Sequence, residues 1–228
     1  MDKLKTYLKH PLSFVLLILI GLASIITVAS IIFIIIYILV NGIPNLTTDL
    51  FSLHYNSKNQ SMLPSIFNTV FITFLTLLIA VPIGIFSAVY LVEYAKKGSK
   101  LVKVIRVTTE TLAGIPSIVF GLFGFLAFVI ALGWGYSMIA GVLTLVMMVL
   151  PTIIRTTEEA LLAVPNSYRE GSFGLGAGKI RTIFKIIVPT AIPGILSGVI
   201  LAIGRIVGET AALIYTSGTV AETATSLT

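Results

Sequence analysis

One uncharged stretch near the start of the chain decides the fold class. It runs from Pro11 to Thr48 and reads PLSFVLLILIGLASIITVASIIFIIIYILVNGIPNLTT. A helix needs about 20 apolar residues to cross a hydrocarbon core of roughly 30 Å, so this stretch is long enough to span a membrane. It is also longer than the apolar region of a secretory signal, which has about 7–15 residues. We therefore expect a retained membrane anchor rather than a cleaved leader.

The composition of the whole chain agrees with a membrane protein. Of its 228 residues, 57% are hydrophobic and only 11% are charged, and the mean hydropathy is +1.07. Five stretches meet the length of a span, near residues 12–40, 65–92, 111–132, 136–154 and 191–215. The sequence predicts an all-α, polytopic helical membrane protein with five spans.

The spans suggest a division of the chain into three parts. Residues 1–64 hold the anchor span and an outer loop, and residues 65–216 form the transmembrane domain, which includes a cytoplasmic loop at 155–189. Residues 217–228 are a polar tail that looks cut short, because no sixth apolar run follows it.

Basic residues predict the orientation, because Lys and Arg that flank spans stay on the cytoplasmic side. Thirteen of them fall on one side of the membrane: Lys3, Lys5, Lys9, Lys96, Lys97, Lys100, Lys103, Arg106, Arg155, Arg169, Lys179, Arg181 and Lys185. Lys58 lies on the other side, and Arg205 lies within a span. The N-terminus is therefore predicted to be cytoplasmic and the C-terminus outside. The net charge of +6 reflects this topology, so we expect no nucleic-acid partner.

The chain lacks the residues that many enzymes need. It has no cysteine, and its two histidines, His10 and His54, lie in unrelated segments. No Asp or His occurs within the predicted spans, so intramembrane hydrolysis has neither a histidine base nor an aspartate pair. We expect a transport subunit rather than an enzyme, with no metal and no cofactor.

The loop at 155–189 is too rich in glycine and in helically spaced apolar residues to be a simple linker. Ser167 and Glu170 have the spacing of a capping box, which predicts a short helix that starts at Ser167. Glycines then break this helix, and a second amphipathic helix follows with four residues on its apolar face: Ile180, Ile183, Phe184 and Ile187. The glycine spacing fits neither a phosphate-binding loop nor a dinucleotide fingerprint. Any nucleotide must therefore bind to another chain.

These motifs resemble a known family. From Glu170 to Pro189 the spacing is similar to the EAA loop of ABC importer permeases, with Glu-Gly-Ser in place of Glu-Ala-Ala and Val188 in place of Leu. Four segments resemble PstA-type permeases of phosphate ABC importers, which are type I importers: LAGIPSIVFGL at 112–122, LPTIIRTTEEA at 150–160, YREGS at 168–172 and GETAA at 208–212.

The resemblance implies a permease that imports inorganic phosphate through a bacterial-type plasma membrane. It implies as partners a dimer of ATPase subunits, a second permease subunit and an extracytoplasmic phosphate-binding protein, in addition to membrane lipid. The loop would dock on the ATPase through Tyr168, Arg169, Glu170 and Gly176. Family members usually have six spans, whereas we predict five here.

Arg205 is the second candidate site. A charged side chain near the middle of a span costs roughly 2.5–3.5 kcal/mol on insertion scales, so it needs a partner or a role. Glu209 lies one turn further on and could form an ion pair with it. We predict that Arg205 faces a water-lined path and helps an oxyanion pass, with Glu209 as a releasable partner. The alternative is a buried structural pair.

The sequence offers two further candidates for the path and two alternative functions. Pro116 with Ser117 is a candidate for the path, although a simple helix kink explains the proline equally well. The substrate could instead be molybdate, sulfate or phosphonate. A protein of another class, an ion-driven secondary transporter, would use Arg205 and Glu209 for ion coupling without an ATPase.

Overall fold

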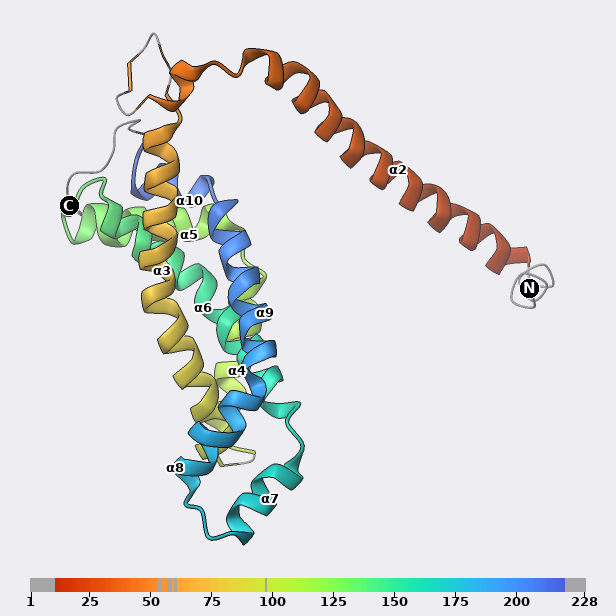
Figure 1. The fold of residues 1–228 in the computed structure, drawn as a ribbon, viewed down its shortest axis with the longest axis vertical. Helices are drawn as coiled ribbons and strands as arrows, with labels where there is room; N and C mark the ends of the chain where they lie inside the picture. Colours follow the sequence, from red (N-terminus) through yellow and green to blue (C-terminus); the bar gives the residue numbers. More distant parts are fainter. Residues whose placement is uncertain (1–10, 53–54, 57–58, 60, 97, 220–228) are drawn as a thin grey trace. The chain divides into compact units, whose positions relative to one another are not determined.

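The computed structural model describes residues 11–52, 55–56, 59, 61–96 and 98–219. The regular secondary structure of these residues is helical, which confirms the all-α prediction (Figure 1). Contacts divide the chain into two units, residues 1–52 with 56–61 and residues 53–55 with 62–228. Several residues used in the sequence arguments lie outside the described part: Lys3, Lys5, Lys9, His10, His54, Lys58, Lys97 and most of the tail at 217–228.

The first unit holds a single long helix, α2 (Pro11–Gly42), followed by the 3-10 turns η1 (Ile43–Asn45) and η2 (Thr48–Phe51). Two of the hydroxyls of α2 bind their own helix, because Ser24 donates a hydrogen bond to the Ile20 carbonyl at 2.8 Å and Thr27 to the Ala23 carbonyl at 2.8 Å. A helix that is apolar on every side, with hydroxyls that bind its own backbone, suits a hydrocarbon environment.

The second unit is built around α6 (Met138–Leu162). On one side lie α3 (Leu63–Val89) and its continuation η3 (Tyr90–Tyr94), a π-helical segment. On another side is a continuous helix formed by α8 (Lys179–Thr182), the π-helical η5 (Ile183–Ile187) and α9 (Val188–Val207). Leu145, Met148 and Ile153 of α6 are fully buried, so α6 is the core of this unit.

A glycine allows α9 to lie close to α6. A Cβ atom at Gly198 would collide with the side chain of Thr156. Gly194 is similar, since its Cβ atom would lie 2.6 Å from that of Ala160. Gly194 and Gly198, four residues apart on α9, therefore serve packing, as small residues do in other membrane helix pairs.

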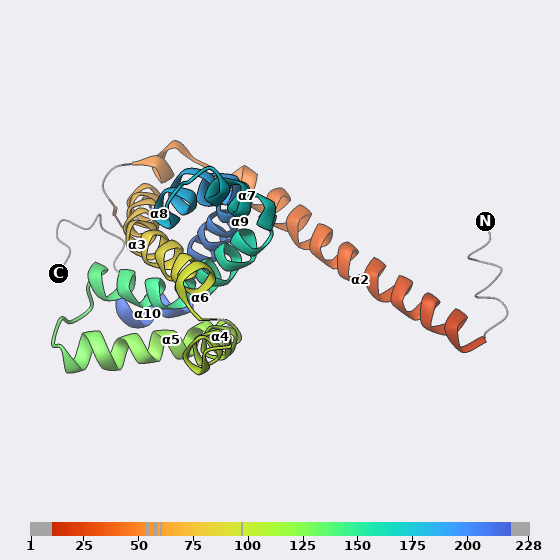
Figure 2. The same ribbon diagram turned by 90° about the horizontal axis from the view of Figure 1, so that it is seen from below.

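The predicted span at 111–132 is not one straight helix. The segment contains α4 (Lys100–Ala113), then α5 (Ser117–Gly124) with its π-helical continuation η4 (Phe125–Ala131), and the two parts are bent by 102°. Figure 2 views α4 nearly end-on and α5 from the side. The bend falls at Pro116, which lacks a backbone N–H and disfavours helical geometry at the residue before it.

The predicted span at 191–215 is also wrong at both ends. The helix begins earlier, at Lys179, and ends at Val207, after which α10 (Ala211–Thr216) is a separate short helix. Glu209 lies in the break and accepts a hydrogen bond from the backbone N–H of Ala212 at 3.0 Å. A carboxylate that binds a free N–H of the next helix stabilises the restart rather than the continuation of α9.

Among the described residues, four helices are long and apolar enough to cross a membrane, and the bent pair adds a fifth if it crosses once. These helices confirm a polytopic helical membrane protein. The cytoplasmic side of the N-terminus stays a prediction.

The predicted loop at 155–189 contains helical residues at both of its ends. Because α6 continues to Leu162 and the next long helix begins at Lys179, only residues 163–178 lie between them. Charged residues at the end of α6 do not stop the helix, since Glu158 pairs with Arg106 of α4 and Glu159 pairs with Arg155.

A short helix, α7 (Asn166–Gly174), occupies this loop, but the capping box is wrong. Pro165 stands at the N-cap position, the helix starts one residue early, and no side chain caps it. The second helix of the loop is the beginning of the long span, and its predicted apolar face is only half correct. Ile183 and Ile187 are buried, whereas Ile180 and Phe184 are exposed.

Candidate coupling surface and translocation path

The short helix α7 lies with α8 at one end of the second unit (Figure 1), where Arg169 of α7 forms an ion pair with Glu93 of η3. We call this the α7 end. Tyr168 is 50% exposed, Glu170 is exposed, and Leu175 is 91% exposed. Gly176 follows with a φ of +82°, a left-handed conformation that favours glycine and turns the chain toward α8. Exposed aromatic and aliphatic side chains beside an acid form a surface suited to a protein partner.

Arg169 belongs to the same helix but points the other way. Its Nη2 and Nε atoms donate hydrogen bonds to Oε1 of Glu93 at 2.7 and 3.0 Å, and both side chains are largely buried. Nη2 also binds the Leu161 carbonyl at 3.1 Å, and Nη1 binds the Val164 carbonyl at 3.0 Å. These carbonyls lie at the C-terminal end of α6, where backbone acceptors have no partner within the helix. Arg169 therefore joins α7 to the ends of both α3 and α6.

Two more contacts hold the α7 end together. The buried hydroxyls of Ser172 and Thr182 are hydrogen-bonded at 2.8 Å, which ties α7 to α8. The Nζ atom of Lys179 lies 4.5 Å from the centre of the Tyr94 ring, a distance at which a cation is attracted to the ring face. The helix that carries the predicted coupling residues is thus fixed on its inward side and open on its outward side.

Arg205 lies on α9 and is half-buried. Its Nη1 atom donates one hydrogen bond, at 3.4 Å, to the hydroxyl of Thr152 on α6. The predicted ion pair with Glu209 is absent from the ion pairs of the described residues. Because α9 ends at Val207, Glu209 no longer follows Arg205 on the same helical face, and its carboxylate binds the N–H of Ala212 instead.

The other two predicted path residues lie at the bend between α4 and α5. Pro116 is exposed, and Ser117 is half-buried as the first residue of α5. Further along α5, a Cβ atom at Gly121 would lie 2.8 Å from the Cα atom of Ala212 in α10. The start of α10, where Glu209 lies, therefore packs directly on α5. Arg205, by contrast, contacts α6.

Sequence reasoning missed Glu93 and Thr152. Glu93 stands 76 residues before Arg169, and Thr152 stands 53 residues before Arg205. Neither has a local pattern that indicates a partner. A glutamate at the end of an apolar stretch was the only available signal for Glu93, and it predicts no particular contact.

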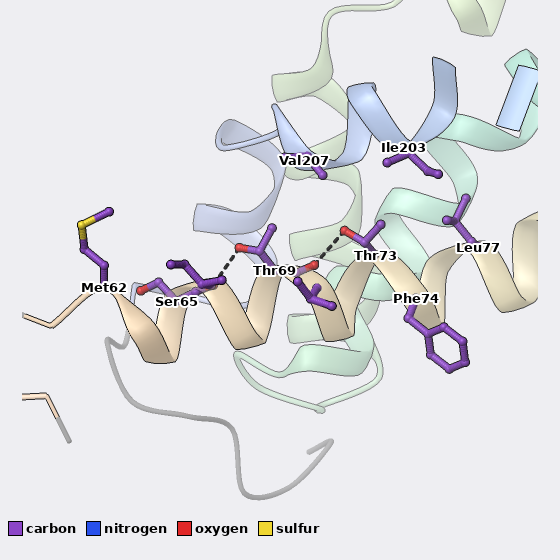
Figure 3. A pocket seen from close by; sticks show the side chains of 10 residues that line it. Met62, Ser65, Thr69, Thr73, Phe74, Leu77, Ile203 and Val207 are labelled. Carbon is purple, nitrogen blue, oxygen red and sulfur yellow. Dashed lines mark hydrogen bonds between the residues drawn. The ribbon is translucent and has the colours of Figure 1, made fainter. Parts of the chain in front are cut away.

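A groove of about 660 Å³ lies between α3 and α9 (Figure 3). Its lining includes Phe74 and Leu77 of α3 and Ile203 and Val207 of α9. The threonines in it bind their own helix, since Thr69 donates to the Ser65 carbonyl at 2.8 Å and Thr73 to the Thr69 carbonyl at 2.7 Å. None of the predicted path residues lines this groove. It offers apolar surface and no charged group for an anion.

The sequence matches known transport proteins. Residues 80–226 match the family described as binding-protein-dependent transport system inner membrane component. A probable ABC transporter permease of Bacillus subtilis (strain 168), YqgI, is 38% identical over 200 residues, which cover 87% of this chain and 68% of that protein. The phosphate transport system permease PstA 1 of Mycobacterium tuberculosis (strain CDC 1551 / Oshkosh) is 45% identical over 140 residues, 61% of this chain and 45% of that protein.

A third relative and a solved structure agree. The phosphate transport system permease PstA of Xylella fastidiosa (strain 9a5c) is 36% identical over 178 residues, 77% of this chain and 62% of that protein. The chain thus spans from under half to about two thirds of the length of these relatives. An inward-facing structure of the MetNI methionine ABC transporter has a TM-score of 0.53 at 23% identity and covers 64% of this chain and 67% of that one, which shows a shared fold.

The relatives confirm the predicted resemblance to PstA-type permeases and the prediction of a transport subunit rather than an enzyme. The helical membrane fold described above agrees with both. The chain belongs to the family of binding-protein-dependent transport system inner membrane components.

Proposed function

We propose that the chain is the permease subunit of an ATP-driven importer of inorganic phosphate in a prokaryotic plasma membrane. The observation that carries this proposal is the state of Arg205. Its half-buried guanidinium makes one long hydrogen bond to a neutral hydroxyl, and it has no acidic partner among the described residues. Relatives that are named phosphate transport system permeases support the choice of substrate.

A guanidinium in this state suits transient anion binding. Arginine presents several N–H donors in a fixed plane that matches the oxygens of phosphate. A carboxylate already bound to it would have to be displaced first, and Glu209 is instead engaged at the start of α10. The bond to Thr152 holds the side chain in place without neutralising it. A single positive group also releases its ion more readily than a closed cage would, which passage requires.

Membership of the family implies an ATPase and a substrate-binding protein as partners. In our proposal the full assembly contains two ATPase subunits, a second permease and an extracytoplasmic phosphate-binding protein. The ATPase docks on the exposed face of α7, through Tyr168, Glu170 and the apolar side chain of Leu175. Pro116 and Ser117 remain proposed path residues, on the strength of their place at the bend between α4 and α5.

Uptake of radiolabelled phosphate by cells that lack their own phosphate permease tests this proposal, with the chain expressed beside its partner subunits. We expect uptake that excess phosphate inhibits and excess sulfate or molybdate does not. Arg205→Ala should lower uptake at least tenfold, whereas Ser197→Ala on the same helix should leave it within twofold. Ser197 is a suitable control because it is exposed and its hydroxyl binds only its own helix, at the Pro193 carbonyl.

Each result identifies a different error. Inhibition by sulfate or molybdate rather than phosphate would assign another oxyanion. Normal uptake by Arg205→Ala would remove Arg205 from the path. Uptake that proceeds without the ATPase, driven by an ion gradient, would replace the importer with a secondary transporter.

A further inference from the structure

The contacts of Arg169 suggest a role other than docking, although its helix is the proposed docking element. Its guanidinium faces the interior of the α7 end and donates to Glu93 and to two carbonyls at the end of α6. The neighbouring Tyr168 and Glu170 are exposed. The donors of Arg169 are therefore bound within this chain, while the residues on both sides of it are exposed and accessible to a partner.

Glu93 occupies a mechanically relevant position. It lies in η3, the π-helical segment that ends the long helix α3. Only 10% of its side chain and 16% of the side chain of Arg169 are exposed. A largely buried ion pair with two hydrogen bonds has a fixed geometry and is weakly screened by salt. A displacement of α7 therefore cannot leave Glu93 behind without separating two buried charges.

We propose that Glu93 and Arg169 form a positioning pair that makes α7 move as one body with the ends of α3 and α6. This inference rests on the proposed function, because it needs an ATPase that displaces α7. The pair transmits the displacement to the spans, and neither residue contacts the ATPase or the substrate. Two further contacts stabilise the α7 end: the hydrogen bond between Ser172 and Thr182, and the cation–π contact of Lys179 with Tyr94.

The first arm of the test measures whether the link is rigid, and it needs no partner protein. The chain contains no cysteine, so spin labels can be placed at Ser167→Cys on α7 and Tyr90→Cys on η3, both exposed positions. We expect a narrow distribution of label distances in the full chain in detergent. Glu93→Gln removes the charge but keeps a hydrogen-bond acceptor, and it should at least double the width of the distribution.

Glu159→Gln is the matched control. It removes a carboxylate from another arginine pair, Arg155 with Glu159, which is exposed and lies within one helix. This variant should leave the distribution unchanged. If Glu93→Gln leaves it equally unchanged, the pair does not fix α7 and the proposal is wrong.

The second arm measures coupling in the reconstituted complex. Glu93→Gln should bind the ATPase and hydrolyse ATP within twofold of the wild type, while phosphate uptake per ATP falls at least tenfold. Glu93→Asp, which keeps the charge, should recover most of the uptake. A loss of ATPase binding in proportion to uptake would overturn the proposal, since it would mean that the pair only shapes the docking surface.

The two arms separate this inference from the function on which it rests. A wild-type complex that neither binds an ATPase nor imports phosphate would refute the proposed function. The distance measurement on the chain alone would still decide whether Glu93 and Arg169 form a rigid link.

Discussion

Arg169 at the α7 end and Arg205 in the last turn of α9 are both arginines that the sequence analysis selected, and the structure places them in opposite states. Arg169 has an acidic partner at 2.7 Å and further bonds to backbone carbonyls. Arg205 has one bond of 3.4 Å to a threonine hydroxyl. The arginine at the α7 end therefore makes several hydrogen bonds, whereas the arginine in a candidate span makes one.

The difference indicates two roles for arginine in this protein, one structural and one in anion binding. A guanidinium whose donors are all used fixes the elements that it touches, and its loss leaves a buried carboxylate without a partner. A guanidinium with unused donors contributes little to the fold and remains available for an anion. Stability should therefore depend strongly on Arg169 and only weakly on Arg205, although the loss of either arginine should lower transport.

The largest effect on stability is expected from Arg169→Ala. The change leaves Glu93 charged and buried, and it removes the donors of the Leu161 and Val164 carbonyls. Breaking a buried pair in this way costs about 3–5 kcal/mol. Reversible unfolding in mixed micelles measures the loss. A loss below about 1 kcal/mol would make Arg169 no more structural than Arg205.

The next largest effect is expected where α9 meets α6, near Arg205. Gly198→Leu forces a side chain into Thr156, and overpacking of this kind costs about 1–3 kcal/mol. The control is Gly204→Ala in the same helix, where a Cβ atom would meet nothing within 4 Å. That change should be neutral or stabilising by up to about 1 kcal/mol. Equal losses in both variants would refute glycine-mediated packing of α9 on α6.

A smaller effect on stability is expected from Arg205→Ala. It removes one hydrogen bond, from the charged guanidinium to the neutral Thr152 hydroxyl. Because this bond is long and only partly buried, the free energy of unfolding should fall by about 1 kcal/mol or less. The same unfolding assay, compared with the uptake assay, gives the contrast with Arg169. A loss as large as that of Arg169→Ala would show that Arg205 is a structural residue.

The smallest effect is expected from Glu159→Gln. The pair of Arg155 and Glu159 has more than half of each side chain exposed, and exposed pairs within one helix contribute little. Its unfolding curve should coincide with that of the wild type at physiological salt. A clear destabilisation would mean that the exposed fraction of an arginine's side chain does not indicate how much its ion pair stabilises the fold.

Local patterns predicted the helical elements well and their ends poorly. The span near 65–92 was expected from its apolar run, and the helix covers Leu63–Tyr94. The capping box at Ser167 failed because Pro165 already sets the start of α7. The fifth helix begins earlier than predicted, because an apolar count ignores amphipathic turns such as Lys179–Thr182, with which this helix starts.

The roles of the coupling and path residues stay predictions. The exposed positions of Tyr168 and Glu170 agree with a coupling surface, because a helix period places successive residues on different faces. The family resemblance assigned Arg169 to the docking surface as well, and nothing near it in the sequence indicates Glu93. The pair of Arg205 and Glu209 was a reasonable expectation on a continuous helix, and it failed when α9 ended between them.

The sequence by itself determined that this protein is a set of apolar helices in a membrane and that it belongs with ABC importer permeases. Apolar length and motif spacing are local properties that need no folded partner to be recognised. Only the tertiary structure decided that Arg169 is tied to Glu93 and that Arg205 meets Thr152. Both contacts join residues more than 50 positions apart, and they exist because packing around α6 brings distant helices within hydrogen-bond distance.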